Sequence, residues 1–397
     1  MPNSSATDQP DYRALLAVLP TGWRERMLQH RLITEHPDTK LDDPDDLMYL
    51  VLLHVGCDLP LRQTVRWVAE AGGVECSHVT LHRKMKRIGP LLQETVAQMA
   101  DERLDIRSEQ WAGYELVVLD GSVVVSPGPS SAGGRLHAAL RLADLSVVGA
   151  QVTTTYEGET LRRFPWSKGQ LVIGDRGYAN PVGVAHVVAH EADLIVRVNR
   201  GALPLFDDDG ERIDLLHWIR SLVGNRAHHR TATVGDETTE KIHGRLVAKR
   251  LPADKIANAH NRVRREVGED PEALELAEWM ILFTTVPTRR LTDTEIIDAY
   301  RLRWQVELLF KRWKSLCHID KLPNYRSDTL VSWLTGKLLL LLCAERIAVP
   351  ATRGLSPPIH TEIEAKVVLD HARTTAVEAH LDHLARRHRS AHAHVAT

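Results

Sequence analysis

The sequence predicts an α/β protein in which helices flank a mixed β-sheet, with a helical region before the sheet and a helical tail after it. Short apolar, β-branched runs begin at Glu115, whereas residues 11–107 suit helices and carry no strong strand pattern. From residue 329 onward the chain again suits helices. Strands followed by alternating helices and strands are typical of a mixed sheet covered by helices.

Composition places the chain among ordinary globular proteins. It has 397 residues, of which 43% are hydrophobic and 26% charged. The longest apolar stretch, Leu338–Ala344, ends at charged residues and is too short to span a bilayer. The first thirty residues lack a secretory signal pattern, and the four cysteines contain no C-x-x-C pair. We therefore expect a cytoplasmic protein with buried thiols and no membrane partner.

Charge is distributed unevenly along the chain. The net charge is −2, but residues 61–100 hold six bases against three acids, and residues 301–314 hold five bases against one acid. Residues 1–60 are acidic, with ten acids and five bases. A polyanion would therefore meet two local basic surfaces on a neutral body.

The first basic stretch has the pattern of a helix-turn-helix. A helix is predicted over Leu61–Ala71, a stop at Gly72-Gly73, and a second helix from an N-cap at Ser77 to about Ile88. Four basic side chains of the second helix are the candidate DNA contacts: Arg83, Lys84, Lys86 and Arg87. The alternative is a small helical bundle with solvated lysines, because the pattern is common.

The remaining elements are expected in the following order. Strands are predicted at Glu115–Leu119, Ser122–Val125, Leu136–Leu142, Ser146–Thr155, Leu171–Ile173, Leu194–Val198 and Trp279–Thr284, with helices at Pro181–His190 and from Thr292 to about Leu316. Residues 200–278 interrupt this regularity and are predicted to be an inserted β-containing subdomain, with a strand candidate at Leu246–Leu251. We accordingly expect an N-terminal helical DNA-binding domain (1–110), a catalytic domain (111–325) and a helical C-terminal region with a role in dimerisation (326–397).

Two aspartates follow apolar strand runs. Asp120 comes after ELVVL, and Asp175 comes after the run that ends at Gly174. Ligands of open α/β sheets bind at such strand ends, and neighbouring carboxylates there favour a hard divalent cation. Each aspartate taken alone is as well explained by a turn or an N-cap.

The predicted helix 292–316 carries a third acid among cations. At about 100° per residue, Tyr300, Arg303, Glu307, Lys311 and Lys314 fall within a stripe of roughly 80°, opposite an apolar face. The alternative is a solvated face with a Glu307/Lys311 ion pair, worth only a few tenths of a kcal/mol.

Taken together, these motifs resemble a known family. The spacing Tyr300-x2-Arg303-x3-Glu307-x6-Lys314 resembles the Y-R-E-K signature of the insertion sequence 4 family of DDE transposases. GDRGY at 174–178 and LDGS at 119–122 are similar to that family's surroundings of its two aspartates, although Ser122 replaces a frequent threonine. The resemblance covers about residues 115–315 and implies a ribonuclease-H-like catalytic core.

The resemblance also implies a chemistry. Asp120, Asp175 and Glu307 would hold two Mg²⁺ or Mn²⁺ ions for in-line phosphodiester displacement, with no nucleotide or organic cofactor.

Substrate contacts follow from the same likeness. Tyr300, Arg303 and Lys314, with Lys311 on the same stripe, would contact the DNA backbone. Trp279 is similar to a family tryptophan that stacks on a flipped base, and the alternative is a core tryptophan on a strand. The partners implied are double-stranded DNA, as terminal inverted repeats and as target, and a second copy of the chain in a homodimer.

The predicted function is therefore a DNA transposase of cut-and-paste type in the bacterial cytoplasm, associated with the nucleoid. Two other functions remain open: a catalytically silent DNA-binding descendant, and a metal-dependent nuclease that cuts without joining. The sequence lacks a G-x-S-x-G elbow, a P-loop and a G-x-G-x-x-G fingerprint, so hydrolase, NTPase and dinucleotide-binding functions have no anchor.

Overall fold

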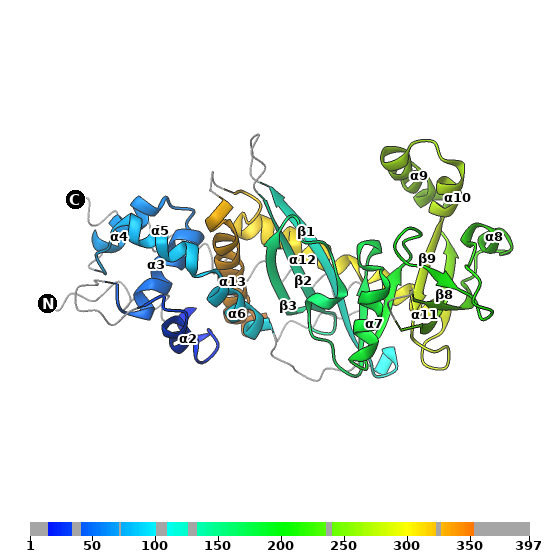
Figure 1. Cartoon of the computed structure of the whole chain (residues 1–397), viewed down its shortest axis with the longest axis horizontal. Coiled ribbons are helices and arrows are strands. Elements are labelled where there is room, and N and C mark those ends of the chain that lie inside the picture. Colours follow the sequence, from blue (N-terminus) through cyan, green and yellow to red (C-terminus); the bar gives the residue numbers. More distant parts are fainter. Residues whose placement is uncertain are drawn as a thin grey trace.

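The computed structural model describes residues 15–33, 41–70, 73–100, 109–125, 133–235, 240–322 and 327–352. The molecule is elongated, with a helical region at one end, β1–β3 at the middle, and strands β8 and β9 with their helices at the other end (Figure 1). None of the described helices is long and apolar enough to cross a membrane.

One mixed sheet forms the body of the chain. Its nine strands run in the order β3-β2-β1-β4-β5-β9-β8-β7-β6. Their bounds are β1 Glu115–Val125, β2 Gly133–Arg141, β3 Ser146–Thr154, β4 Gln170–Gly174, β5 Asp193–Arg197, β6 Leu205–Phe206, β7 His228–Val234, β8 Ile242–Arg250 and β9 Trp279–Thr284. The mixed sheet expected from the sequence is confirmed, with β1, β4 and β5 parallel and the other pairs antiparallel.

The strand predicted to stop at Asp120 does not stop there. β1 continues through Asp120 and Gly121 to Val125, because its partner β2 pairs with it throughout, with Asp120 opposite Ala138. What ends near Asp120 is the pairing with β4, which covers only Glu115–Val118. The prediction of two short strands was therefore wrong, and Asp120 lies where β1 loses its second neighbour.

The segment predicted as an insertion extends the same sheet. β8 pairs with β9, and β7 and β6 follow, so strands of residues 205–250 continue the sheet beyond β5. The predicted insertion does contain β-strands, but these strands join the main sheet and do not form a separate subdomain. Three helices belong to this part: α8 Leu215–Arg220, α9 Ala253–Val267 and α10 Pro271–Ala277.

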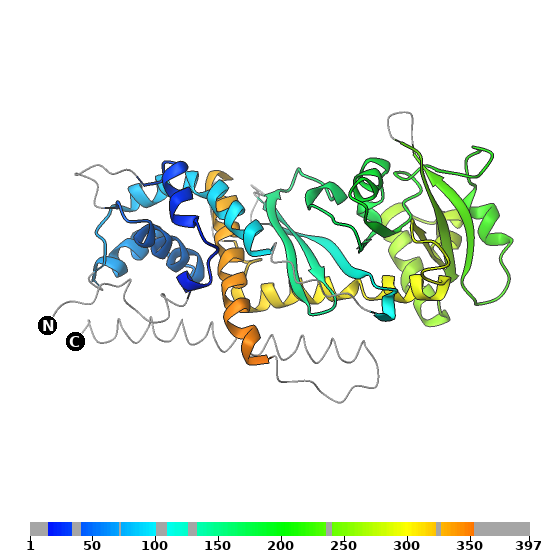
Figure 2. The same ribbon diagram turned by 90° about the horizontal axis from the view of Figure 1, so that it is seen from below.

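Helices cover both faces of the central strands. In β1, Leu116 and Val118 pack into one apolar core while Val117 and Leu119 pack into another, as the alternation of strand side chains requires. Helix α12 (Trp304–Cys317) contacts β1 and β2 from one face, and α7 (Pro181–Ala189) contacts β5 on the other side (Figure 2).

The helical region before the sheet is confirmed. Its helices are α2 Trp23–Gln29, α3 Pro44–Gly56, α4 Leu61–Glu70, α5 His78–Arg87 and α6 Gly89–Ala100, with the short 3-10 helix η2 Glu109–Trp111 before β1. Helix α13 (Ser327–Thr352) packs against α3, α6 and β3, so the N-terminal helices and the sheet share one apolar core. Most of the predicted C-terminal tail, 353–397, lies outside the described residues.

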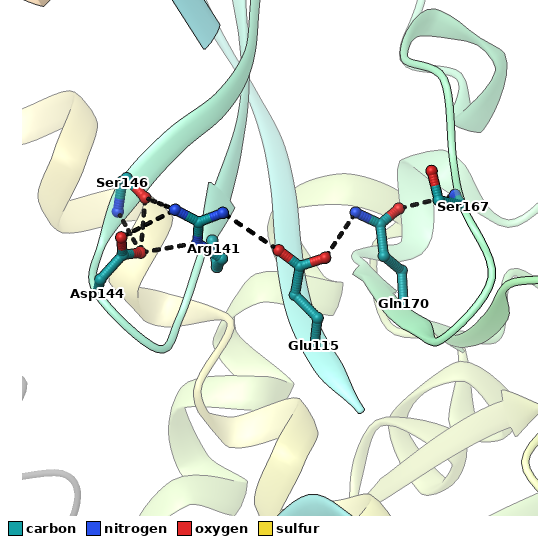
Figure 3. Close-up of polar contacts among 6 residues, drawn as sticks. All are labelled: Glu115, Arg141, Asp144, Ser146, Ser167 and Gln170. Carbon is teal, nitrogen blue, oxygen red and sulfur yellow. Dashed lines mark hydrogen bonds and ion pairs between the residues drawn. The ribbon is translucent and has the colours of Figure 1, made fainter. Parts of the chain in front are cut away.

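A buried arginine connects three strands at the end of the sheet where β1 begins. Arg141, at the end of β2, is 2% exposed and binds Asp144 through two nitrogens at 2.9 Å. It also lies 3.4 Å from Glu115 at the start of β1, and Glu115 in turn accepts a hydrogen bond from Gln170 at the start of β4 (Figure 3). Ser146 completes this network with hydrogen bonds to Arg141 and Asp144.

Candidate active site

Asp120 extends from β1 toward the face covered by α12. Its Oδ1 accepts the Gly121 N–H at 2.8 Å, and its Oδ2 lies 3.3 Å from Nη1 of Arg303. The side chain is 19% exposed. Asp120 is therefore held by its own strand on one side and by the start of α12 on the other.

Asp175 follows the neighbouring parallel strand. It lies directly after β4, as the sequence predicted, at the N-cap position of the short helix η4 (Arg176–Tyr178), to which its side chain makes no capping hydrogen bond. Its Oδ1 accepts a hydrogen bond from the Tyr300 hydroxyl at 2.9 Å. Asp175 and Asp120 thus lie on adjacent strands, each contacted by a residue of the same C-terminal segment.

That segment is two helices and not the single long helix predicted. α11 (Asp293–Arg301) and α12 are separated at Leu302 and Arg303, where the backbone forms tighter i to i+3 hydrogen bonds. Tyr300 is at the end of α11, Arg303 is the N-cap residue of α12, and Glu307 lies in the first turn of α12.

Arg303 connects two acids of the site. Its Nη2 lies 2.6 Å from Oε1 of Glu307 while its Nη1 contacts Asp120. Glu307 therefore pairs with Arg303, and not with Lys311 as the alternative interpretation of this helix supposed. The three predicted acids are brought together around one guanidinium and one phenol.

The two aspartates have opposite electrostatic environments. Burial raises the pKa of Asp120 to about 6 and outweighs the lowering by the Gly121 N–H and Arg303, while Glu159 and Asp175 add smaller raising contributions. Burial also opposes the ionisation of Asp175, but Arg303, the Arg176 N–H and the Tyr300 hydroxyl outweigh it and hold its pKa below the usual range. Pairs of acids with separated pKa values are characteristic of functional sites.

The site contains one acid that the motifs did not reveal. Glu159 follows β3, and its carboxylate lies beside Gly121 and Gly177, next to both predicted aspartates. It raises the pKa of Asp120, and burial together with Asp175 raises the pKa of Glu159 itself. Glu159 lies in a loop with no periodicity, so no pattern in a single sequence marks it.

The family described as Transposase DDE domain matches residues 111–343, which spans the sheet, the three acids and most of α13. The chain belongs to this family.

Individual relatives of this transposase domain are bacterial. The chain is 28% identical to "Putative transposase InsL for insertion sequence element IS186A" of Escherichia coli over 322 residues, which are 79% of this chain and 87% of that protein. It is 28% identical over 301 residues to the transposase for insertion sequence element IS421 of Escherichia coli. The match covers 73% of this chain and 81% of that protein. The transposase for insertion sequence element IS231E of Bacillus thuringiensis subsp. finitimus is 30% identical over 138 residues. This match covers 34% of this chain and 29% of that protein.

Trp279 lies farther along the sheet of the transposase domain. It begins β9 and is 8% exposed within the apolar core of that part. It also lines a cavity of about 210 Å³, together with Arg176 of the GDRGY segment, Arg197 and Asn199. Arg197, which the sequence did not single out, ends β5 at the same edge as Asp175 and lowers that acid's pKa.

The other predicted DNA contacts lie outside the acid cluster. Lys311 is exposed and Lys314 half-buried on α12, beyond Glu307. The basic residues of α5 lie in the N-terminal helical region, beyond α6 and α13 from β1 (Figure 1).

The structure gives two of the α5 residues an internal role. Lys84 donates a hydrogen bond to the Leu32 carbonyl, and Arg87 donates one to the Arg31 carbonyl. Both residues therefore connect α5 to the segment that follows α2. Arg83 and Lys86 are exposed. The predicted helices α4 and α5 are present and in contact, with Ser77 accepting the Thr80 N–H as the N-cap.

The carboxylates fit a divalent cation in charge, though not as a ready-made cage. In the part of the chain that the structure describes, no three His, Cys, Asp or Glu side chains are arranged to hold a metal ion. Instead the guanidinium of Arg303 supplies positive charge between Asp120 and Glu307. Burial raises the pKa of Asp120 despite this contact, and a bound cation would favour its charged form.

Proposed function

We propose that this transposase cuts the ends of its mobile element and joins them to target DNA, at a centre where Asp120, Asp175 and Glu307 bind two Mg²⁺ or Mn²⁺ ions. The cations would supply an activated nucleophile and stabilise the leaving oxygen of the phosphodiester. The ribonuclease-H-like core and the Y-R-E-K signature are part of this proposal. A bacterial cytoplasm, with the chain on nucleoid DNA, is the setting in which these substrates occur.

One observation carries the proposal. Three segments far apart in sequence, 119–122, 174–178 and 300–307, meet through the contacts of Arg303 with Asp120 and Glu307 and of Tyr300 with Asp175. Surface acids on an unrelated α/β domain would have no reason to share a guanidinium and a phenol.

The basic residues around the acids suit a phosphate backbone. Arg303 would exchange its carboxylate partners for a DNA phosphate once cations neutralise Asp120 and Glu307. Lys311 and Lys314 would extend this contact along α12, and Tyr300 would orient Asp175.

The cavity beside Trp279 suits an extrahelical base. Its volume of about 210 Å³ and its lining by an indole and by Arg176 and Arg197 offer a stacking surface next to phosphate donors. We include Trp279 in the DNA-binding surface on this ground.

The proposal extends to the rest of the chain. Residues 1–110 would recognise the terminal inverted repeats, with Arg83, Lys86 and Arg87 as exposed bases of α5 and the half-buried Lys84 beside them. Residues 326–397 would serve the homodimer through the part beyond α13, since α13 itself is engaged in the core.

The direct test is cleavage of a duplex carrying the inverted repeat that flanks the gene, in the presence of Mg²⁺. We expect Asp175→Asn to lower cleavage at least a thousandfold without weakening DNA binding. Asp298→Asn, an exposed acid on α11 paired with Arg301, is the matched control and should retain activity.

Two results would redirect the proposal. Binding without cleavage by the unchanged protein would indicate a silent DNA-binding descendant. Cleavage without transfer of a labelled 3′ end to a plasmid would indicate a nuclease.

A further inference from the structure

Glu159 lies against the backbone of both aspartate motifs. Its side chain is 27% exposed and comes from the loop between β3 and η3 (Leu161–Arg163). Its nearest cation is Arg135 on β2, with Nη1 3.7 Å from Oε1, which is beyond hydrogen-bond distance. Among the described residues, no hydrogen-bond donor contacts its carboxylate. Glu159 is thus a half-buried acid with weak compensation.

Two motif glycines make room for this carboxylate. A Cβ added at Gly177 would lie 1.9 Å from Oε2 of Glu159, and its three nearest neighbours would all be Glu159 atoms. A Cβ added at Gly121 would lie 3.1 Å from Oε1 of the same residue. Neither glycine has a positive φ, so the close approach of Glu159 accounts for them, and not an unusual backbone conformation.

The position of Glu159 complements that of Glu307. Successive strand residues face opposite sides, so the open side of Gly121 is the one opposite to the Asp120 side chain, which meets α12. Glu307 therefore borders Asp120 from the α12 side, and Glu159 borders it from the other. Three carboxylates, those of Asp120, Asp175 and Glu159, interact electrostatically at the strand edge.

We propose that Glu159 is a fourth acidic residue of the cation centre, a positioning residue whose charge draws the divalent cation to Asp120 and Asp175. The idea rests on the cation centre of the proposed function and adds a residue to it. A purely structural glutamate would be expected to have short partners, as Glu115 has in Gln170 at 2.9 Å. Outer carboxylates around a metal site typically contribute ten- to a hundredfold to metal affinity.

The test is Mn²⁺ binding by the full-length protein without DNA, followed by the loss of the free Mn²⁺ signal in electron paramagnetic resonance at pH 8. We expect Glu159→Gln to weaken the affinity about tenfold or more with an unchanged melting temperature. Glu157→Gln, an exposed neighbour that pairs with Arg163 at 3.6 Å, is the matched control and should bind as the wild type. Wild-type affinity in Glu159→Gln would overturn the proposal.

Substitution of Gly177 provides an independent test in which Glu159 keeps its charge. Gly177→Ala should displace the carboxylate and weaken Mn²⁺ binding, because its new methyl group would occupy the position of Oε2. In a Glu159→Ala background the same change should have no further effect, since the obstacle is gone. Equal losses in both backgrounds would show that Gly177 acts independently of Glu159, and would contradict the proposal.

Asp175→Asn separates the two levels of the argument. If it leaves Mn²⁺ binding unchanged, the cation centre itself is wrong and the role of Glu159 fails with it. If it abolishes binding while Glu159→Gln and Gly177→Ala do not change it, the centre stands and only Glu159 is excluded.

Discussion

The two ends of the paired stretch of β1 and β4 carry acidic clusters that are balanced in opposite ways. At its start, Glu115 shares the buried Arg141 with Asp144, and hydrogen bonds from Arg141 and Ser146 outweigh burial and lower the pKa of Asp144 (Figure 3). Farther along the same strand, burial raises the pKa of Asp120 to about 6 even though Arg303 is in contact. At Asp144 the contacts within the chain outweigh burial, whereas at Asp120 burial outweighs them.

This difference separates a structural network from a site. A buried arginine with two acids and several hydrogen bonds holds β1, β2 and β4 in register. Acids with too little positive charge cost stability in the folded state but attract a cation and, with it, a phosphate. The comparison predicts that substitutions of the acids at the two ends will change stability in opposite directions.

The largest effect is expected at the compensated end. Arg141→Met should lower the free energy of unfolding by about 3–5 kcal/mol, because it leaves Glu115 and Asp144 without their buried partner. Denaturant unfolding followed by circular dichroism measures the loss.

The matched change at the other end is Arg303→Met. It should cost less than half as much, since Glu307 is 47% exposed and water can replace its partner. A similar cost at both ends would contradict the distinction.

The next substitution, Asp120→Asn, is expected to raise the free energy of unfolding. The folded protein holds a proton on Asp120 up to about pH 6, whereas the unfolded chain releases it near pH 4. The free energy of unfolding therefore falls as the pH rises from 4 to 6 and stays lower at pH 7. Asp120→Asn removes this loss and should stabilise the protein at pH 7 by at most about 3 kcal/mol, with no gain below pH 4.

Asp144 supplies the opposite case for the same measurement. Because its folded pKa is lowered, its carboxylate stabilises the protein above pH 4, and that stability is lost as the pH falls further. Asp144→Asn should therefore destabilise at pH 7 by about 2 kcal/mol, and the difference should shrink in acid. Parallel melting curves from pH 3 to 8 would show two trends of opposite sign, and equal signs would refute the interpretation.

A third, smaller effect concerns the cation. A divalent ion that binds only the folded protein should raise the free energy of unfolding by about 1.4 kcal/mol at ten times its dissociation constant. Thermal melts with and without Mn²⁺ should show this gain in the wild type and in Asp144→Asn, and not in Asp120→Asn. A gain retained in Asp120→Asn would place the cation elsewhere.

The same two ends show what the sequence could predict. Short apolar runs and period-2 alternation located the central strands, although β1 was divided in two. Motif spacing singled out Asp120, Asp175, Tyr300, Arg303 and Glu307 as site residues. These signals are local, since they depend on the alternation of apolar residues and on helix spacing.

The misses all depend on tertiary partners. The continuity of β1 past Gly121 depends on pairing with β2, and the break between α11 and α12 accompanies the contacts of Tyr300 with Asp175 and of Arg303 with Asp120. Glu159 gains its place from the space beside Gly121 and Gly177, which no single window of sequence contains.

The smallest effect on stability is expected for substitution of Lys311. Its effect on DNA binding tests whether the DNA contacts the end of the β1–β4 pairing that carries Asp120. Lys311 is exposed on α12 near the acids, so Lys311→Ala should change the free energy of unfolding by less than about 0.5 kcal/mol. If it contacts a phosphate, the slope of log affinity against log salt should fall by about one charge in DNA-binding titrations. Lys168→Ala removes the same charge from an exposed lysine just before β4, beside the Arg141 network, and should leave the slope unchanged. An equal change of the salt slope in both variants would mean that DNA binding depends on net charge alone and that Lys311 makes no specific phosphate contact.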